Sequence, residues 1–179
     1  RELLLSFDTL ALHALKTASF LGPAFAPYRA DYLKALRAIA TDHEREMREG
    51  ALETLVMEKV DFARRLLSEG LRRPERALVA EAKAIQLLSY DGHAEVAPLV
   101  RKVFTQTADL PTKEAALRFL SADPASAPLL SRVLKDPSQP ARVRSLSATG
   151  LRLADPKAFE RTARAIVKNG KEDDEVGAT

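Results

Sequence analysis

The chain repeats itself at an interval of 32 residues, and this period constrains its fold more than any other feature. Asp91, Asp123 and Asp155 lie 32 residues apart, each at a break between apolar segments. Between the breaks, apolar residues recur at the spacing of an α-helix, and no segment alternates as a strand does. A period of this length with two helices per unit is typical of an α-solenoid, in which each unit buries its apolar face against the next.

Two pairs of segments are near copies of each other. Residues 97–104 read APLVRKVF, and residues 127–134 read APLLSRVL. Residues 47–55 (MREGALETL) and 143–151 (VRSLSATGL) share an apolar residue, an Arg, a small residue and a Leu at matching places. The second pair is separated by 96 residues, which is three periods of 32. The copies predict repeated helices that pack on one another.

The segment ARVRSLSATGLRLAD, residues 141–155, is the clearest example of such a packing helix. It stops at Asp155-Pro156, where the Asp is expected to cap the next helix and the Pro to fit its first turn. Its small residues are expected to let neighbouring helices approach closely. Leu153 falls at helical spacing with Val143, Leu146 and Gly150. We expect one face of this helix to pack against its neighbours: Val143, Leu146, Ser147, Gly150 and Leu151.

This arrangement of Asp-Pro, an "aVR..sL" helix, an Asp turn and a second helix rich in Leu and Val resembles a HEAT repeat. It is most similar to the short HEAT-like type found in relatives of phycobilin lyases. Residues 136–167 are the best copy, and the resemblance covers about residues 28–169. It implies an all-α, right-handed α-α superhelix of about ten helices, paired into roughly five units. The resemblance names an architecture and supplies no catalytic residue.

We predict a single α-solenoid domain over residues 1–179 and expect it to be a monomer. Residues 1–41 would form a divergent N-terminal helical unit, residues 42–171 the HEAT-like repeats and residues 172–179 a polar tail. The composition agrees with a packed chain, because 46% of the residues are hydrophobic and 30% are charged. A disordered chain would contain fewer apolar residues.

Several classes of protein are excluded by composition. The absence of Cys excludes disulfides, zinc–thiolate sites, iron–sulfur clusters and a Cys nucleophile. No apolar run approaches the roughly 20 residues of a membrane span. We favour a cytoplasmic location, but the periplasm stays open because the chain begins at Arg1 and not at Met, which we interpret as a trimmed or processed start.

No constellation of residues predicts catalysis or metal binding. His13, His43 and His93 fall in different units, and HEREM at 43–47 has Met47 where the zinc-protease HExxH motif has its second His. The three periodic Asp residues are explained as turn and cap residues. There is neither a Gly-rich phosphate loop nor a GxSxG elbow. We therefore expect no enzymatic activity, no cofactor and no metal ion.

One charge pattern points to a partner. Four cations in the helix after Asp155 recur at spacings of four, three and four residues, within a strip about 60° wide. They are Lys157, Arg161, Arg164 and Lys168. In HEAT-type solenoids the second helix of each unit usually lines the concave surface, which predicts a positive groove. The candidate partner-binding residues are Arg101, Lys102, Arg132, Lys135, Arg161, Arg164 and Lys168.

The alternative interpretation of these cations is a solvated polar face, which every surface helix needs. The acidic run at residues 172–175 follows the strip at once and could neutralise it from within the chain. The net charge of +3 arises from 28 basic and 25 acidic residues, so the whole chain is only mildly basic. The choice between a groove and a solvated face stays open at this point.

We expect a non-catalytic scaffold for protein–protein contact. Its partner is unknown, and the positive groove favours an acidic protein. Nucleic-acid binding through phosphate contacts is a second hypothesis, although the chain has no Trp for stacking on bases. A third hypothesis is an accessory domain of a larger enzyme, whose catalytic residues would lie in a separate domain.

Overall fold

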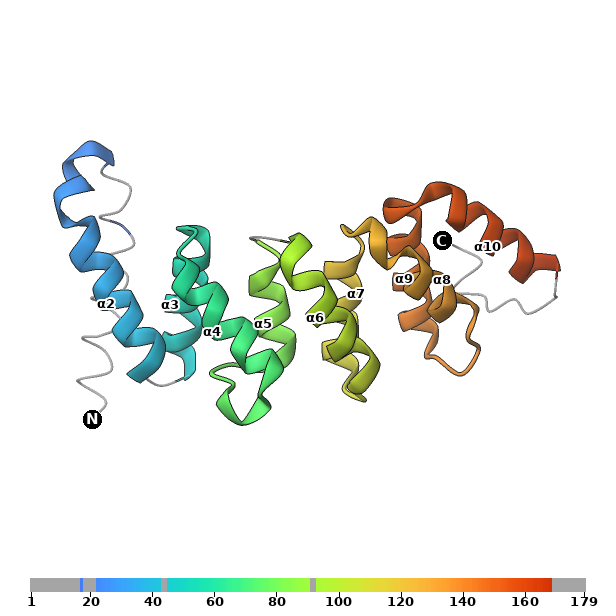
Figure 1. The fold of residues 1–179 in the computed structure, drawn as a ribbon, viewed down its shortest axis with the longest axis horizontal. Helices are drawn as coiled ribbons and strands as arrows, with labels where there is room; N and C mark the ends of the chain where they lie inside the picture. Colours follow the sequence, from blue (N-terminus) through green and yellow to red (C-terminus); the bar gives the residue numbers. More distant parts are fainter. Residues whose placement is uncertain (1–16, 18–21, 43–44, 91–92, 169–179) are drawn as a thin grey trace. The chain divides into compact units, whose positions relative to one another are not determined.

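The computed structural model describes residue 17 and residues 22–42, 45–90 and 93–168. These residues contain nine α-helices, three short 3₁₀ helices and no strand, which confirms the predicted all-α class (Figure 1). The 3₁₀ helices are η1 (Gly22–Tyr28), η2 (Pro74–Arg76) and η3 (Pro124–Ser126). The α-helices are α2 (Arg29–Asp42), α3 (Arg45–Met57), α4 (Asp61–Arg72), α5 (Glu81–Leu88), α6 (His93–Gln106), α7 (Leu110–Leu120), α8 (Ala127–Lys135), α9 (Ala141–Ala154) and α10 (Pro156–Lys168).

The chain divides into two compact units, Arg1–Leu66 and Leu67–Thr179, called unit 1 and unit 2 below. In unit 1, α2 packs on α3, and Leu36 of α2 and Leu52 of α3 are fully buried. An exposed cation–π contact is also present in this unit, because the Arg37 guanidinium lies 5.6 Å from the centre of the Phe62 ring. The prediction of a single domain stays a prediction.

In unit 2 the helices follow one another in a regular order of contacts. α5 packs against α7, and α7 packs against α9. α6 lies against α7, α8 lies against α9, and α10 lies against both α8 and α9. Figure 1 shows α6 in front of α7 and α8 in front of α9. The right-handed superhelix inferred from the resemblance stays a prediction, whereas the neighbour-to-neighbour packing within unit 2 is observed.

The near copies in the sequence bury equivalent residues in the structure. Four buried apolar residues of α6, Ala97, Val100, Val103 and Phe104, match Ala127, Leu130, Val133 and Leu134 of α8. Four of α3, Met47, Ala51, Leu52 and Leu55, match the buried Val143, Ser147, Ala148 and Leu151 of α9. Val96 of α6 and Val56 of α3 are also buried, without a buried apolar equivalent in the other copy. Each large apolar side chain stabilises the fold by roughly 1.5–3 kcal/mol when buried. The sequence period therefore corresponds to a period of burial.

The predicted packing face of α9 is buried along most of its length. Val143, Gly150 and Leu151 are buried, and Leu146 is half-buried. Leu153, which falls at the same helical spacing, lies outside the buried face, because its side chain is 67% exposed. Leu153 follows Leu151 by two residues, and at about 100° per residue this places it on the opposite side of the helix.

The Asp residues of the turns act as predicted where the structure describes them. The Oδ1 atom of Asp123 accepts a hydrogen bond from the backbone N–H of Ala125 at 3.2 Å. The Oδ1 atom of Asp155 accepts one from Ala158 at 2.9 Å and so caps the first turn of α10. Asp91 lies outside the described residues. The Asp155 cap therefore fixes where α10 begins, whereas Asp123 caps η3, the 3₁₀ turn that precedes α8.

Candidate functional site

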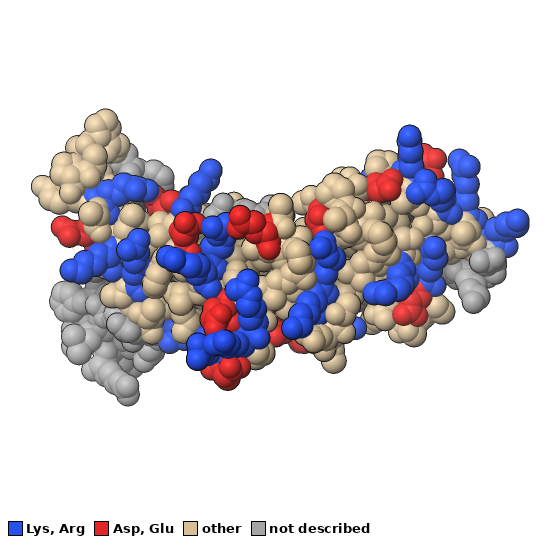
Figure 2. Space-filling view, viewed as in Figure 1, with Lys and Arg blue, Asp and Glu red and all other residues tan. Residues whose placement is uncertain are grey.

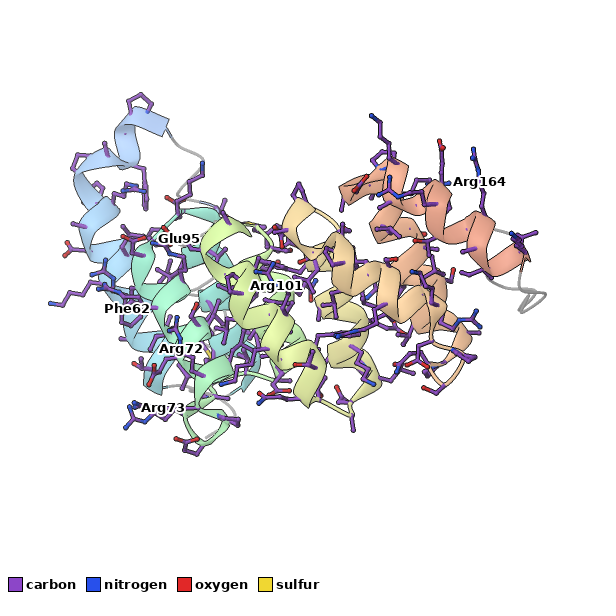
Figure 3. The ribbon with its side chains drawn as sticks, turned by 45° about the vertical axis from the view of Figure 1, so that its right-hand side comes forward. Phe62, Arg72, Arg73, Glu95, Arg101 and Arg164 are labelled. Atoms are coloured by element: carbon purple, nitrogen blue, oxygen red, sulfur yellow. The ribbon has the colours of Figure 1, made fainter. Side chains whose placement is uncertain are left out.

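Helix α10 presents four cations on its exposed side, which we call the cation strip. Its members are Lys157, Arg161, Arg164 and Lys168, and all four are exposed. The one fully buried residue of α10 is Thr162, which is 4% exposed. At about 100° per residue, the strip lies roughly 100–160° around the helix from Thr162. Figure 3 shows the labelled Arg164 extending outward from α10.

The orientation of α10 is set by two polar contacts. The cap from Asp155 fixes its first turn. Near the middle of the helix, the hydroxyl groups of Ser131 in α8 and Thr162 share a hydrogen bond of 2.8 Å. Phe159 and Ile166 are half-buried on the same side as Thr162. With this side held against α8 and α9, the cation strip faces solvent.

The cation strip affects the stability of α10 in both directions. Lys168 lies in the last turn, where the helix dipole favours a cation, and Glu160 lies four positions before Arg164, a spacing that favours an ion pair. Arg164 lies 3.7 Å from Glu160, and both side chains are largely exposed. Lys157, Arg161 and Lys168 form no ion pair with any residue that the structure describes. Like charges three or four positions apart destabilise a helix by about 0.2–0.5 kcal/mol per pair. Lys157 also lies in the first turn, where the helix dipole disfavours a cation.

The predicted cations of α8 have a different explanation. Arg132 and Lys135 are exposed, and both lie in the last turn of α8. A cation at that end interacts favourably with the helix dipole, so the stability of α8 accounts for both. On the face shown in Figure 2, Lys and Arg side chains lie over α6, α8 and α10. The α8 cations are therefore available to a partner, but their presence alone does not indicate one.

The two predicted site residues on α6 differ in their exposure and in their contacts. Lys102 is exposed, whereas Arg101 is half-buried and forms an ion pair with Asp123. The same Arg101 guanidinium donates a hydrogen bond of 3.1 Å to the hydroxyl of Ser126. Ser126 in turn donates to Asp123. Arg101 therefore holds the turn before α8, and a partner carboxylate would have to compete with Asp123 for it.

Two charged residues with clear structural roles were missed from the sequence. Arg144 is 5% exposed, and its Nε atom donates a hydrogen bond of 3.2 Å to the carbonyl of Leu134. Glu114 of α7 forms ion pairs with Arg118 at 3.0 Å and with Arg142 at 2.5 Å. The recurrence of an Arg at the same place in both near copies of the α9 segment was a usable signal for Arg144. Glu114 had no such signal, because its main partner comes from another helix.

Neither a metal centre nor a membrane span emerges from the described part of the chain. Within it, no group of three or more His, Cys, Asp or Glu residues is placed to hold a metal ion. His93 is the first residue of α6, and His13 and His43 lie outside the described residues. None of the helices searched there combines the length and the apolarity that crossing a membrane requires.

Comparisons with known proteins do not assign the chain to a family. No family model matches it, and neither curated proteins nor solved structures give a match.

Proposed function

We propose that the chain is a non-catalytic scaffold of HEAT-like helix pairs that binds an acidic segment of another protein through the cation strip of α10. The observation that carries the proposal is that four like charges share one exposed side of α10, where neighbouring members repel each other, and that three of them form no ion pair with any residue that the structure describes. Partner carboxylates would remove this repulsion. The charges that repel each other in the free chain would thus contribute to affinity and to the rate of association in a complex.

The scaffold part of the proposal is supported by the repeated burial and by the packing of α5 on α7 and of α7 on α9. Contacts between successive units are what stabilises an α-solenoid, and its extended surface is what such proteins use for binding. The mechanism would then consist of shape and charge complementarity, with no bond made or broken.

Charge reversal on the cation strip tests the proposal. The purified chain is titrated with labelled polyglutamate and, separately, with a short DNA duplex, each at low and moderate salt. We expect polyglutamate to bind with an affinity that falls as salt rises, because the contact is between exposed charges. The double variant Arg161→Glu with Arg164→Glu is expected to weaken binding by at least about tenfold.

The chain offers a matched control for this experiment. Lys34 of α2 and Arg65 of α4 are exposed cations of unit 1. Reversing both to Glu changes the net charge by the same amount as the strip variant, and it should leave binding intact. Equal loss in both variants would mean that net charge alone drives binding, and no loss in either would remove the cation strip as the site. Binding of the duplex without binding of polyglutamate would favour the nucleic-acid hypothesis.

Affinity capture identifies the partner once direct binding is established. The wild-type chain and the Arg161→Glu, Arg164→Glu variant are used as baits in the lysate of the source organism. A protein captured by the wild type and lost with the variant would be a partner of the cation strip. A protein captured by both would bind elsewhere on the scaffold.

A further inference from the structure

Helix α10 buries far less of its surface than the helices before it in unit 2. Six residues of α9 and five of α7 are buried, and α5 and α8 each bury four. In α10 only Thr162 is buried. Its apolar side is therefore broader than the contact that it makes with α8 and α9 within the described residues.

One row of this apolar side, which we call the α10 ridge, runs from the contact with the neighbouring helices toward solvent: Phe159, Ala163 and Val167. These residues are spaced by four, and rows of this spacing are what helices use to pack into the grooves of other helices. Phe159 and Ala163 are half-buried, and Val167 is 62% exposed. The ridge extends about 12 Å along the helix, which is just over two turns.

The C-terminal half of the α10 ridge lies beside Arg164 of the cation strip, whereas Lys157 and Arg161 lie on the other side of the helix. Val167 and Arg164 are three positions apart, so their side chains are neighbours on the helix surface. Lys168 follows Val167 at the C-terminal end. Glu160 borders the N-terminal half of the ridge and lies 3.7 Å from Arg164. An apolar row with Arg164 on one border and Lys168 at one end is the complement of an amphipathic helix with carboxylates on its border.

We propose that the acidic segment bound by this chain is an amphipathic helix that lies along α10, with its apolar side chains on the α10 ridge. Its carboxylates reach Arg164 and Lys168, in the C-terminal half of the ridge, because Glu160 repels them from the other half. This inference rests on the proposed function and adds the structure of the partner to it. A nucleic-acid backbone would use the cations but would leave the ridge exposed to water.

Three synthetic probes separate this inference from simple charge attraction. The first is a helical peptide with Leu at every third or fourth position and Glu beside it. The second is a scrambled peptide of the same composition, and the third is polyglutamate. We expect the first probe to bind about tenfold more tightly than the other two, since burial of one or two apolar side chains is worth about that factor.

An uncharged substitution on the α10 ridge provides a second test, measured as a change in affinity. Val167→Asn is expected to weaken binding of the amphipathic peptide about fivefold to tenfold and to leave polyglutamate binding unchanged. Leu153→Asn is the matched control, because Leu153 is an apolar residue of α9 with a similar exposure of 67%. It should change neither affinity. Thermal unfolding of both variants checks that the fold is retained.

The outcomes distinguish the two proposals. Equal binding of the three probes, or no effect of Val167→Asn on the amphipathic peptide, would overturn the helical partner and leave the acidic scaffold in place. No binding of any probe at low salt would overturn both. Binding of a DNA duplex alone would replace both with nucleic-acid recognition.

Discussion

The backbone of Gly150 in α9 lies against the side chain of Ser121 at the end of α7. A Cβ atom added at Gly150 would be 3.3 Å from the Cβ atom of Ser121 and 3.5 Å from a methyl carbon of Leu130 in α8. Gly150 is thus the point at which α9 contacts both of these neighbours, and the missing side chain allows the approach. The sequence predicted such an approach from the small residues of α9.

Substitutions of Gly150 should therefore depend on size. Gly150→Ala is expected to change the free energy of unfolding by less than about 1 kcal/mol, because the gain in helix propensity offsets the tight contact with Ser121. Gly150→Val should lower it by about 1–3 kcal/mol, because two further methyl groups must fit the same space. Urea unfolding measures both values. A Val variant as stable as the wild type would contradict the close packing of α7 and α9.

The two leucines near the end of α9 offer a paired test of which face is buried. Leu151 has no exposed surface, whereas Leu153 is 67% exposed. Leu151→Asp is expected to lower the free energy of unfolding by more than about 3 kcal/mol, since it places a charge in the core. Leu153→Asp should change it by less than about 0.5 kcal/mol. Circular dichroism during urea unfolding is the measurement, and similar losses in both variants would be inconsistent with the helix orientation described above.

Removal of the Arg101–Asp123 ion pair should destabilise unit 2. The side chains of Arg101 and Asp123 are 30% and 13% exposed. When one of them is removed, water therefore replaces only part of the contact that the other loses. Arg101→Ala is expected to cost about 1–3 kcal/mol of unfolding free energy, because the Asp123 carboxylate is left without this donor. Lys102→Ala, next to it and exposed, is the control and should cost less than about 0.5 kcal/mol. A double-mutant cycle with Asp123→Ala that gives no coupling energy would show that the pair contributes nothing.

Two carboxylates, Glu114 of α7 and Asp109 at its N-cap, should make stability depend on pH. The pKa of Glu114 lies below its ordinary value of 4.5, chiefly because Arg142 donates a hydrogen bond to it, and Arg118 adds to this effect. The pKa of Asp109 lies below 3.8 because the side chain and the backbone of Thr112 donate to it. Both pKa values are lower in the folded chain than in the unfolded chain, so the ionised carboxylates stabilise the fold. This stabilisation is complete above the pKa values of the unfolded chain and is lost as the pH falls through the pKa values of the folded chain.

The loss of unfolding free energy below about pH 4.5 is measurable by urea unfolding at a series of pH values. Glu114→Gln should make the dependence shallower, because the titrating group is gone. Asp109→Asn should do the same while it retains a capping side chain for α7, since Asn is as good an N-cap as Asp. An unchanged slope in both variants would mean that other carboxylates carry the acid dependence.

The sequence by itself determined the all-α class, the turns at Asp123 and Asp155, and the strip of α10. These features depend on neighbours within a few positions, because helix period, capping and the phase of residues around one helix are local properties. The near copies also determined which positions of α6 and α8 are buried, since equivalent helices in a repeat meet equivalent neighbours.

Only the tertiary structure decided which cations form ion pairs or hydrogen bonds with other parts of the chain. Arg101 and Lys102 are adjacent in the sequence, but Arg101 is paired with an Asp that lies 22 positions away and Lys102 is exposed. Arg144 is buried because the carbonyl of Leu134, from another helix, accepts its hydrogen bond. Leu153 is exposed because the neighbours of α9 pack on its other side. A helical pattern gives the phase of a side chain around its own axis, and the helices packed against that axis decide whether the side chain meets protein or water.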